Sequence, residues 1–586
     1  MAIEQGILSD KLWTDPVVDY SNEDLHSFCS KLDISTEVGM ILASRNRMDA
    51  EGAFRFLNPQ AGQLHDPWLL RGMDTTVDRL LHAILHYQKI FIFGDNDVDG
   101  TASTALLYGY LKAVGGRVHY FIPDRLRDGF SLHPDTAQRL VASKAELVVT
   151  VDNGSGAVDG VDLLRRNGID TLITDHHQVP PMQPAALAMV NPQHPDCRYP
   201  FKDLSAAGVA YKIIKALHQH CARMDVFSQR GITPPNPDYN LDLVALATVA
   251  DMSPLVGENR ILVRLGFEMM EFHPRPGLVG LLKECNVRGG ISPRLIHTKI
   301  APKINAMGRV GDPSIGVKLL LTHSYGEGRR LSRILCDTNR KRQEIEGLAL
   351  ALSEAQVAEQ MENPAFVLVG KDWHPGILGI LASRIASQYN KPTVVLTQHH
   401  GEISQGSARG VEGFDLLSVL KSCEGLLDRF GGHTNAAGLA LPSNRLDAFA
   451  RRFQAATKDC RDSAGRQAKD NPSKDKLAID TWVNQDHFTR GFVEEISRLS
   501  PFGFGNPEPV VALRDVSLEK PMVLNSRHLK FQVSCHNGPE VEAFGWDAAQ
   551  HNLDLSRRYD LALAPQVSQL GDSTRTTFRL VDVRSA

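Results

Sequence analysis

The stretch Lys89-Ile-Phe-Ile-Phe93 runs directly into Gly94-Asp95-Asn96-Asp97-Val98-Asp99-Gly100. The first of these segments is mostly apolar and short, which is typical of a buried β-strand. Residues 101–114, after the acidic segment, carry apolar side chains at helical spacing and end before Gly115-Gly116. A strand, a polar turn and a helix in this order predict the first unit of a parallel sheet covered by helices.

Further apolar runs in the first half of the chain end in acidic or histidine motifs. Leu147–Val151 leads into Asp152-Asn153-Gly154, residues 171–174 lead into Asp175-His176-His177, and residues 243–250 lead into Asp251. We expect each of these runs to be a strand. Parallel strands deliver their carboxyl ends to one edge of an open sheet, where ligands bind. The pattern therefore predicts that these polar side chains gather at one edge of the sheet.

Such a gathering of carboxylates needs a cation, because the negative charges would otherwise repel one another. Oxygen ligands with one histidine suit manganese or magnesium better than structural zinc. Two such ions, about 3.5–4 Å apart, can activate water and neutralise phosphate oxygens. The sequence thus indicates a two-metal phosphoesterase. Each motif alone has a plainer reading as a helix cap, a solvated loop or a pair of structural histidines.

The spacing Asp-x-Asp-x-Asp-Gly at Asp95–Gly100 also occurs in calcium-binding loops. No glutamate follows at the required offset, and a strand-like run precedes the motif. A calcium loop is therefore not favoured.

Size and composition set outer bounds on the protein. With 586 residues, 42% hydrophobic and 23% charged, the chain resembles a soluble protein of roughly three or four domains. No signal-like start and no long apolar run are present, so we expect a cytoplasmic protein without a membrane span. The eight cysteines form no CxxC pair, which argues against a zinc knuckle or disulfide framework. The net charge of −4 neither indicates nor excludes nucleic-acid binding.

The expected fold class is α/β, in which a parallel-sheet lobe is joined by a long helix to a smaller α/β lobe and followed by a small β-barrel. Residues 1–74 are predicted to be helices and loops, and residues 460–477 to be a polar linker. The alternating short β-like runs of the last segment are typical of an OB-fold. The expected divisions are an N-terminal region at 1–74, the catalytic lobe at 75–320, the connecting helix at 321–360, the smaller lobe at 361–460 and the barrel at 478–586.

The order and spacing of the acidic motifs resemble the DHH phosphoesterase superfamily. Further motifs narrow the resemblance to the RecJ family of bacterial single-strand-specific exonucleases, and the match covers roughly residues 75–585. These motifs are Ile122-Pro-Asp-Arg125, Pro302-Lys-Ile-Asn-Ala-Met-Gly-Arg309, Trp373-His-Pro-Gly376, Gly379-Ile-Leu-Ala-Ser-Arg384, Gly406-Ser-Ala-Arg409, Phe430-Gly-Gly-His433 and Phe502-Gly-Phe-Gly-Asn-Pro-Glu-Pro509.

The resemblance implies a DHH lobe, a DHH-associated lobe that binds substrate, and two divalent cations, Mn²⁺ or Mg²⁺. The implied metal ligands are Asp95, Asp97, Asp99, Asp152, His176 and Asp251. The implied catalytic residues are Asp152, His176 and His177. The implied contacts to the strand and its 5′-phosphate are Arg125, Phe130, Asn305, Arg309, Ser407, Arg409, Gly432 and His433. Phe93 departs from the pattern, because many members of the superfamily have a histidine at its position.

The activity implied by the resemblance is 5′→3′ hydrolysis of single-stranded DNA to mononucleotides, in DNA repair and recombination. Implied partners are a single-strand-binding protein and a RecQ-type helicase, and the chain is expected to be a monomer. One alternative is a phosphodiesterase that acts on short oligonucleotides or cyclic dinucleotides. Another is a non-catalytic subunit that binds nucleic acid.

Overall fold

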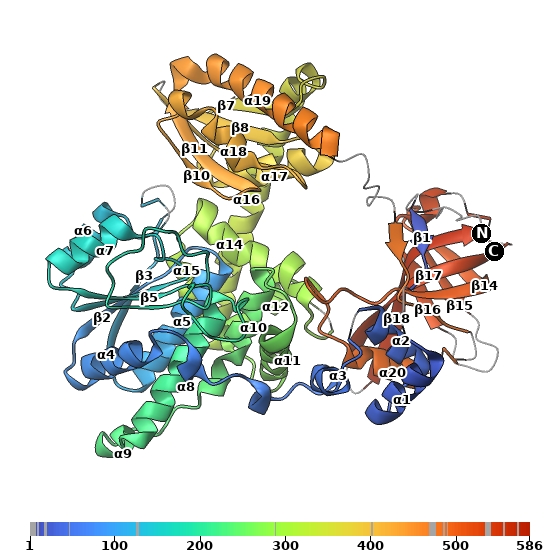
Figure 1. The fold of residues 1–586 in the computed structure, drawn as a ribbon, viewed down its shortest axis with the longest axis horizontal. Helices are drawn as coiled ribbons and strands as arrows, with labels where there is room; N and C mark the ends of the chain where they lie inside the picture. Colours follow the sequence, from blue (N-terminus) through green and yellow to red (C-terminus); the bar gives the residue numbers. More distant parts are fainter. Residues whose placement is uncertain are drawn as a thin grey trace.

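A computed structural model describes residues 8, 11–16, 20–45, 47–124, 128–129, 131–287, 289–399, 402–467, 476–484, 487–488, 490–533, 541–551, 553–554, 557–570 and 573–585. The described residues form a catalytic lobe, a smaller lobe joined to it by a long helix, and a barrel packed with the N-terminal helices (Figure 1). Both chain termini lie at the barrel (Figure 1). No helix in this described part has the length and hydropathy that a membrane span needs.

The catalytic lobe is built on a parallel sheet with strand order β3-β2-β4-β5-β6. Its strands are β2 (Lys89–Phe93), β3 (Arg117–Phe121), β4 (Leu147–Val151), β5 (Asp170–Thr174) and β6 (Ala188–Val190). Helices near the sheet are α4 (Met73–Leu85), α5 (Val98–Ala113), α6 (Pro134–Ala142), α7 (Val158–Arg166) and α8 (Ala206–Arg223). The predicted strand–turn–helix unit around the first acidic motif is therefore confirmed.

The prediction of a strand at residues 243–250 is wrong, because this segment is helix α10 (Leu241–Ala250). The helix is buried almost all round, between α5, α8 and α11 (Gly257–Phe272). A helix enclosed on every side has no polar stripe, so its sequence shows the same continuous apolar run as a buried strand. Asp251 is consequently the C-cap of a helix and not the end of a strand.

Further helices complete the lobe and lead into the connecting helix. They are α9 (Val226–Gln229), α12 (Pro276–Glu284), α13 (Pro293–Leu295), the π-helical turn η4 (Ile296–Ile300), α14 (Ala301–Val310) and α15 (Ser314–Leu321). The predicted long helix is α16 (Tyr325–Glu359), which begins in the catalytic lobe and ends beside the smaller one (Figure 1). Ser324 caps its first turn by accepting a hydrogen bond from the backbone N–H of Glu327.

The smaller lobe has a mixed sheet with strand order β10-β11-β9-β8-β7. Its elements are β7 (Phe366–Lys371), α17 (Pro375–Tyr389), β8 (Thr393–His399), β9 (Ile403–Arg409), α18 (Leu416–Lys421), β10 (Arg429–Gly432), β11 (Ala436–Pro442) and α19 (Leu446–Gln467). The predicted linker at 460–477 is wrong over its first part, because α19 continues to Gln467. Phe449 and Phe453 anchor the earlier turns of α19 in the core of the smaller lobe.

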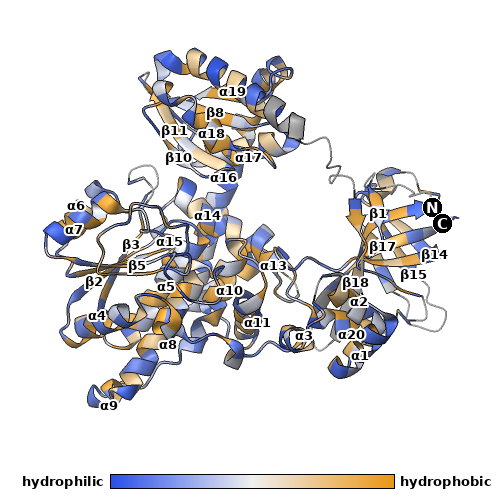
Figure 2. Cartoon of the chain, in the orientation of Figure 1, coloured by the Kyte–Doolittle hydropathy of each residue, from blue (hydrophilic) through white to orange (hydrophobic). Residues whose placement is uncertain are grey.

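The C-terminal strands close into the expected barrel through pairing of β14 with β17. They are β13 (Thr481–Trp482), β14 (Val511–Leu524), β15 (His528–Val533), β16 (Val541–Gly545), β17 (Arg558–Leu570) and β18 (Ser573–Ser585), and α20 (Arg490–Arg498) packs beside them. Figure 2 shows hydrophobic residues along the barrel strands and both hydrophilic and hydrophobic residues on the neighbouring helices. Along β15 partly exposed and buried positions alternate, as expected of a strand with one face in the core.

The N-terminal residues share one hydrophobic core with the barrel, although the two segments are far apart in the sequence. The helices are α1 (Asn22–Leu32), α2 (Thr36–Ser44) and α3 (Ala50–Leu57). The expectation of helices and loops alone missed a short strand, β1 (Leu12–Thr14), which pairs in parallel with β12 (Lys476–Ala478). Three residues carry too little periodicity to reveal a strand, and its pairing partner lies more than 450 residues away.

Candidate active site

The first acidic motif forms the turn between β2 and α5. Asp97 is the N-cap of α5, and its carboxylate accepts a hydrogen bond of 3.0 Å from the backbone N–H of Gly100. Asp99 lies in the first turn of α5 and is only 1% exposed. Its carboxylate accepts hydrogen bonds from the backbone N–H groups of Ala206 (2.8 Å) and Ala207 (2.9 Å) at the start of α8. The N-terminus of α8 therefore fixes the position of this buried negative charge.

Asp152 follows β4 directly and is 4% exposed. Its backbone has φ of +64°, a left-handed conformation that non-glycine residues rarely adopt. The backbone N–H of Asp152 donates to the carbonyl of Thr174 on the neighbouring strand β5, at 3.0 Å. Strained backbone held in this way is concentrated at functional sites.

Asp175 organises the pair of histidines that follows β5. Its carboxylate accepts hydrogen bonds from the backbone N–H groups of Ser155, His176 and His177 and from His177 Nδ1. Burial raises the pKa of Asp175, but the hydrogen bonds and the charge of His177 outweigh it and leave the pKa below its usual range. The hydrogen bond to Asp175 in turn raises the pKa of His177 to about 9. Asp175 thus orients His177, as a carboxylate behind a functional histidine commonly does.

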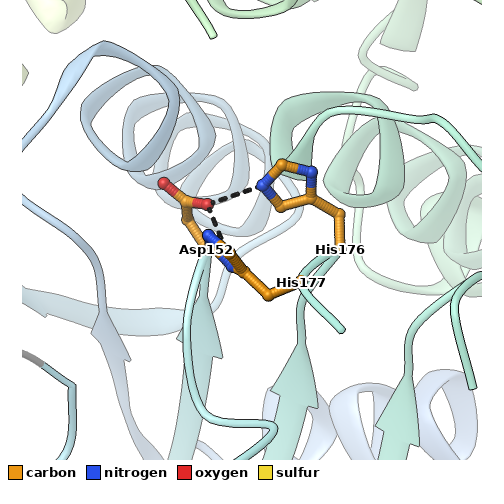
Figure 3. Close-up of side chains that lie close together, drawn as sticks. All are labelled: Asp152, His176 and His177. Carbon is orange, nitrogen blue, oxygen red and sulfur yellow. Dashed lines mark ion pairs between the residues drawn. The ribbon is translucent and has the colours of Figure 1, made fainter. Parts of the chain in front are cut away.

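The ends of β4 and β5 bring Asp152 and both histidines together, as Figure 3 shows. His176 Nε2 lies 3.1 Å from Asp152 Oδ1 and 3.8 Å from Asp99 Oδ2, and His177 Nδ1 lies 3.9 Å from Asp152 Oδ1. His176 Nδ1 lies 4.0 Å from Asp251 Oδ2, so helix α10 contributes to the same cluster.

Potential ligand atoms lie within 4.8 Å of one another in overlapping groups among the described residues. These groups are Asp152 with His176 and His177, Asp99 with His176 and Asp251, and Asp95 with Asp97 and Asp152. The structure therefore brings together every residue that the sequence predicted as a metal ligand. Asp152 belongs to two of the groups, which is the position expected of a carboxylate shared by two cations.

The electrostatics of the cluster fit a site for cations. Burial, and then the charges of Asp251 and Asp97, raises the pKa of Asp99 to about 7, although His176 opposes this. Burial also raises the pKa of Asp152 well above its usual range, and the charges of Asp97 and Asp99 add to the effect. Buried carboxylates that destabilise one another in this way gain a favourable partner when divalent cations bind.

The surroundings of His176 give a second indication that the cluster is a site for cations. Its Nε2 atom is buried and makes no hydrogen bond within the described part of the chain, although Asp152 Oδ1 is 3.1 Å away. A buried nitrogen without a hydrogen-bond partner is costly, whereas a neutral imidazole can offer the same atom as a ligand. The residues present therefore fit divalent cations, Mn²⁺ or Mg²⁺, held by carboxylate oxygens and one histidine.

Replacing Asp175 with alanine is expected to lower the free energy of unfolding by about 2–4 kcal/mol, because three backbone N–H groups and His177 Nδ1 lose a buried acceptor. Urea unfolding measures this change. The matched control is Asp170→Ala at the start of β5, which removes a half-exposed carboxylate paired with Arg79 and should cost about 1 kcal/mol or less. Equal losses in the two variants would contradict the organising role of Asp175.

Asn305 and Arg309 lie on α14, which packs against the first acidic motif. Asn305 Oδ1 accepts a hydrogen bond of 3.0 Å from the backbone N–H of Val98, so it holds the start of α5. A Cβ atom at Gly308 would lie 2.2 Å from the carbonyl oxygen of Asn96, so only glycine allows this close approach. The geometry gives Asn305 a positioning role next to the predicted metal ligands Asp97 and Asp99, in a segment predicted to contact the strand.

Arg309 and Arg409 approach the N-terminal turns of α17 from opposite lobes. Arg309 Nη1 donates to the carbonyl of Gly376 at 3.3 Å. A Cβ atom at Gly379 would lie 2.9 Å from Arg409 Nη2, and Arg409 Nη1 donates to Ser407 Oγ at 2.8 Å. Three of the residues predicted to hold a 5′-phosphate therefore lie around one helix N-terminus, where backbone N–H groups favour anions.

The remaining residues predicted to contact the strand lie in different parts of the structure or outside its described residues. Gly432 is the exposed last residue of β10, and His433 lies exposed in the turn to β11, where its backbone N–H donates to the carbonyl of Ala436. Arg125 and Phe130 lie outside the described residues. Phe93 is fully buried and stacks on Phe121, with ring centroids 5.7 Å apart, so this side chain belongs to the core and not to the cluster.

The sequence reasoning missed the part that the start of α8 plays in holding Asp99. The segment Ser205-Ala-Ala-Gly208 does carry a signal, because serine is a preferred N-cap and Ser205 accepts a hydrogen bond from the backbone N–H of Gly208. That signal predicts a helix start. It does not predict which carboxylate lies in front of it.

Comparison with known proteins agrees with this architecture. Residues 89–248 match the DHH family N-terminal domain, residues 362–459 match the DHHA1 domain, and residues 479–582 match the RecJ OB domain. The single-stranded-DNA-specific exonuclease RecJ of Dickeya dadantii (strain 3937) is 35% identical over 520 residues, which are 85% of this chain and 89% of the relative. The protein of the same name from Bacillus subtilis (strain 168) is 31% identical over 533 residues, which are 90% of this chain and 65% of the relative.

The fold also matches solved structures. The crystal structure of RecJ in complex with Mn²⁺ from Thermus thermophilus has a TM-score of 0.77 at 27% identity, covering 98% of this chain and 79% of that one. The Mg²⁺ complex from the same organism has a TM-score of 0.71 at 26% identity, covering 98% and 78%. With its three matched domains and its acidic cluster, the chain belongs to the RecJ family of single-stranded-DNA-specific exonucleases, which are metal-dependent nucleases of the DHH superfamily.

Proposed function

We propose that this protein degrades single-stranded DNA from its 5′ end to mononucleotides by two-metal-ion hydrolysis, in DNA repair and recombination. The observation that carries the proposal is the convergence of Asp95, Asp97, Asp99, Asp152, His176 and Asp251 on one site at the edge of the sheet. The single-stranded-DNA-specific activity of the relatives supports the choice of substrate.

The metal ligands proposed here divide into two groups: Asp95, Asp97 and Asp152 form one, and Asp99, His176 and Asp251 form the other. Asp152 Oδ1 lies 3.1 Å from His176 Nε2, so Asp152 is the carboxylate proposed to bridge the two groups. Bound divalent cations supply Lewis-acid activation of water and neutralise charge on the phosphodiester. His177 is half-exposed and held by Asp175, so its other ring nitrogen can donate a hydrogen bond to a phosphate oxygen.

The 5′→3′ direction of degradation is proposed to come from a pocket that holds the 5′-terminal phosphate at the N-terminus of α17. Arg309 approaches from the catalytic lobe, and Arg409 and Ser407 approach from β9 of the smaller lobe. Guanidinium groups grip phosphate oxygens with paired hydrogen bonds, and these contacts position a strand without reading its sequence. A strand anchored there would place its first phosphodiesters towards the acidic cluster, across the junction of α14 and α17.

The direct test compares single strands labelled at the 5′ end with strands labelled at the 3′ end, in the presence of Mn²⁺. The expected first product from a 5′-labelled strand is a labelled mononucleotide, while the 3′ label stays on a shortening strand. Release of 3′-labelled mononucleotide first would reverse the proposed polarity. Cleavage of dinucleotides without cleavage of longer strands would favour the phosphodiesterase alternative, and binding without hydrolysis would favour the non-catalytic one.

Replacing Arg409 with alanine is expected to raise KM for a 5′-phosphorylated strand about tenfold, because a hydrogen bond to a charged group is lost. A strand with a 5′-hydroxyl lacks the phosphate, so its KM should change much less. The measurement is therefore the ratio of kcat/KM for the two strands, in the wild type and in the variant.

The matched control for this variant is Arg384→Ala, which removes a half-exposed arginine of α17 that pairs with Glu346. The ratio should stay at the wild-type value in this control. A 5′-phosphate preference that survives Arg409→Ala unchanged would place the pocket elsewhere.

The proposal includes the oligomeric state, the location and the partners of the protein. We propose a monomeric, cytoplasmic protein that works with a single-strand-binding protein and a RecQ-type helicase and has the domain divisions predicted above. The shared core of the barrel and residues 25–57 supports treating those two segments as one folding unit.

A further inference from the structure

The segment Phe502-Gly-Phe-Gly-Asn506 between α20 and β14 forms a tight, well-anchored turn. The backbone N–H of Gly503 donates to the carbonyl of Asn506 at 2.8 Å, and the reverse bond is 3.1 Å long. Asn506 is 1% exposed, and its side-chain amide donates to the carbonyls of Leu499 and Pro501 at 2.9 Å each. The buried amide therefore fixes the shape of the turn.

The tip of this turn is docked on the catalytic lobe, just after the metal ligand Asp251. The backbone N–H of Leu255 donates to the carbonyl of Phe504 at 2.7 Å. Gly505 has φ of +74°, and a Cβ atom there would lie 2.8 Å from the Cβ atom of Pro254. A larger residue at this position would strain the backbone and separate the turn from the catalytic lobe.

The aromatic ring at the tip faces solvent, although the backbone around it is held on both sides. Phe504 is 61% exposed. Met252, which directly follows Asp251, is 54% exposed with φ of +58°. Apolar side chains are thus presented at the docking contact, where the chain is only a few residues from the acidic cluster.

Basic side chains accompany this apolar surface. A Cβ atom at Gly503 would lie 3.8 Å from the Cβ atom of Pro293, so the turn also reaches the start of α13. Arg294, His297 and Lys299 follow in α13 and η4 and are exposed. Arg294 and Lys299 therefore follow closely, in the chain, the residue that the turn contacts, and basic and aromatic side chains together are what proteins use to bind single strands, since bases stack and phosphates pair with cations.

We propose that Phe504 stacks on a nucleobase of the single strand as it passes between the barrel and the catalytic lobe. The inference rests on the proposed function, and it names a binding residue contributed to the catalytic site by the turn before the barrel. Because the backbone of the turn is hydrogen-bonded to Leu255, the backbone that carries the ring is already in place before the strand arrives, so little backbone ordering is needed on binding. Stacking on an aromatic ring also tolerates any base, as a nuclease without sequence preference requires.

The test uses the full chain with Mn²⁺ and strands that carry 2-aminopurine at successive positions, with phosphorothioate linkages to slow hydrolysis. In the wild type we expect the fluorescence to be quenched strongly at one position or two adjacent ones. Phe504→Ala should lose this quenching and bind the strand about tenfold more weakly. Phe504→Tyr keeps an aromatic face and should retain both, whereas Phe504→Leu keeps apolar bulk and should lose both.

The matched control is Phe272→Ala, which removes another exposed phenylalanine, 70% exposed at the end of α11, and should leave affinity and quenching unchanged. Circular dichroism and thermal melting of each variant show whether it folds. Wild-type affinity and an unaltered quenching pattern in Phe504→Ala would overturn the inference alone. Absence of binding and hydrolysis of single strands by the wild type would overturn the proposed function as well.

Discussion

Replacing Asp152 with asparagine is expected to reduce turnover on single-stranded DNA by about three orders of magnitude or more, because the carboxylate proposed to bridge the two groups of ligands loses its charge. Asparagine is the right substitution, since it keeps the size of the side chain and tolerates the φ of +64°. Single-turnover hydrolysis in Mn²⁺ measures the loss. Wild-type turnover in this variant would mean that the metal assignment is wrong.

The same substitution is expected to raise the melting temperature of the metal-free protein. Asp152 is buried beside Asp97 and Asp99, and neutralising it removes repulsion without creating a cavity. Asp560→Asn is the matched control, because that buried carboxylate pairs with Arg584 at 3.0 Å in the barrel. The control should melt at a lower temperature and keep its activity, so the two variants shift the melting temperature in opposite directions.

Removing divalent cations is expected to abolish hydrolysis and to destabilise the catalytic lobe. Each site filled at about a hundred times its Kd stabilises the folded state by about 2.7 kcal/mol, provided that the unfolded chain does not bind the cation. For a lobe of this size that corresponds to a rise of about 5–10 °C in Tm for each site. Calorimetry in EDTA and then in excess Mn²⁺ measures the shift.

The rise in Tm with Mn²⁺ should require an intact acidic cluster. In Asp152→Asn the rise in Tm with Mn²⁺ should be largely lost, whereas Asp560→Asn should show the full rise. A rise of equal size in both variants would show that Mn²⁺ binds elsewhere in the chain and would contradict the proposed site.

Much of the site could be predicted because its motifs sit next to recognisable strands. Residues 89–93, Leu147–Val151 and residues 171–174 are short, apolar and flanked by turn residues, and each is a strand in the structure. Once these runs are strands of a parallel sheet, their carboxyl ends must share an edge. The meeting of Asp99, Asp152 and His176 follows from that rule.

The rule that the carboxyl ends of parallel strands share one edge does not explain the position of Asp251. The prediction placed it at the end of a fourth strand, and it arrived at the same cluster from the end of α10. Periodicity distinguishes a strand from a helix only when one face is polar, and α10 has no polar face. The residue lies in the predicted cluster, but the structural reason given for its position was wrong.

The sequence by itself determined the local order of strand, acidic turn and helix, the chemistry of the ligands, and the alternating strands of the barrel. These features depend on residues close together in the chain, whose spacing and side-chain type can be read directly. Only the tertiary structure decided that the N-terminus of α8 holds Asp99, that Asn305 holds the start of α5, and that the turn at Phe504 docks beside Asp251. Each of these contacts joins residues from about a hundred to about 250 positions apart, and such pairings are set by how whole elements pack and not by any local pattern.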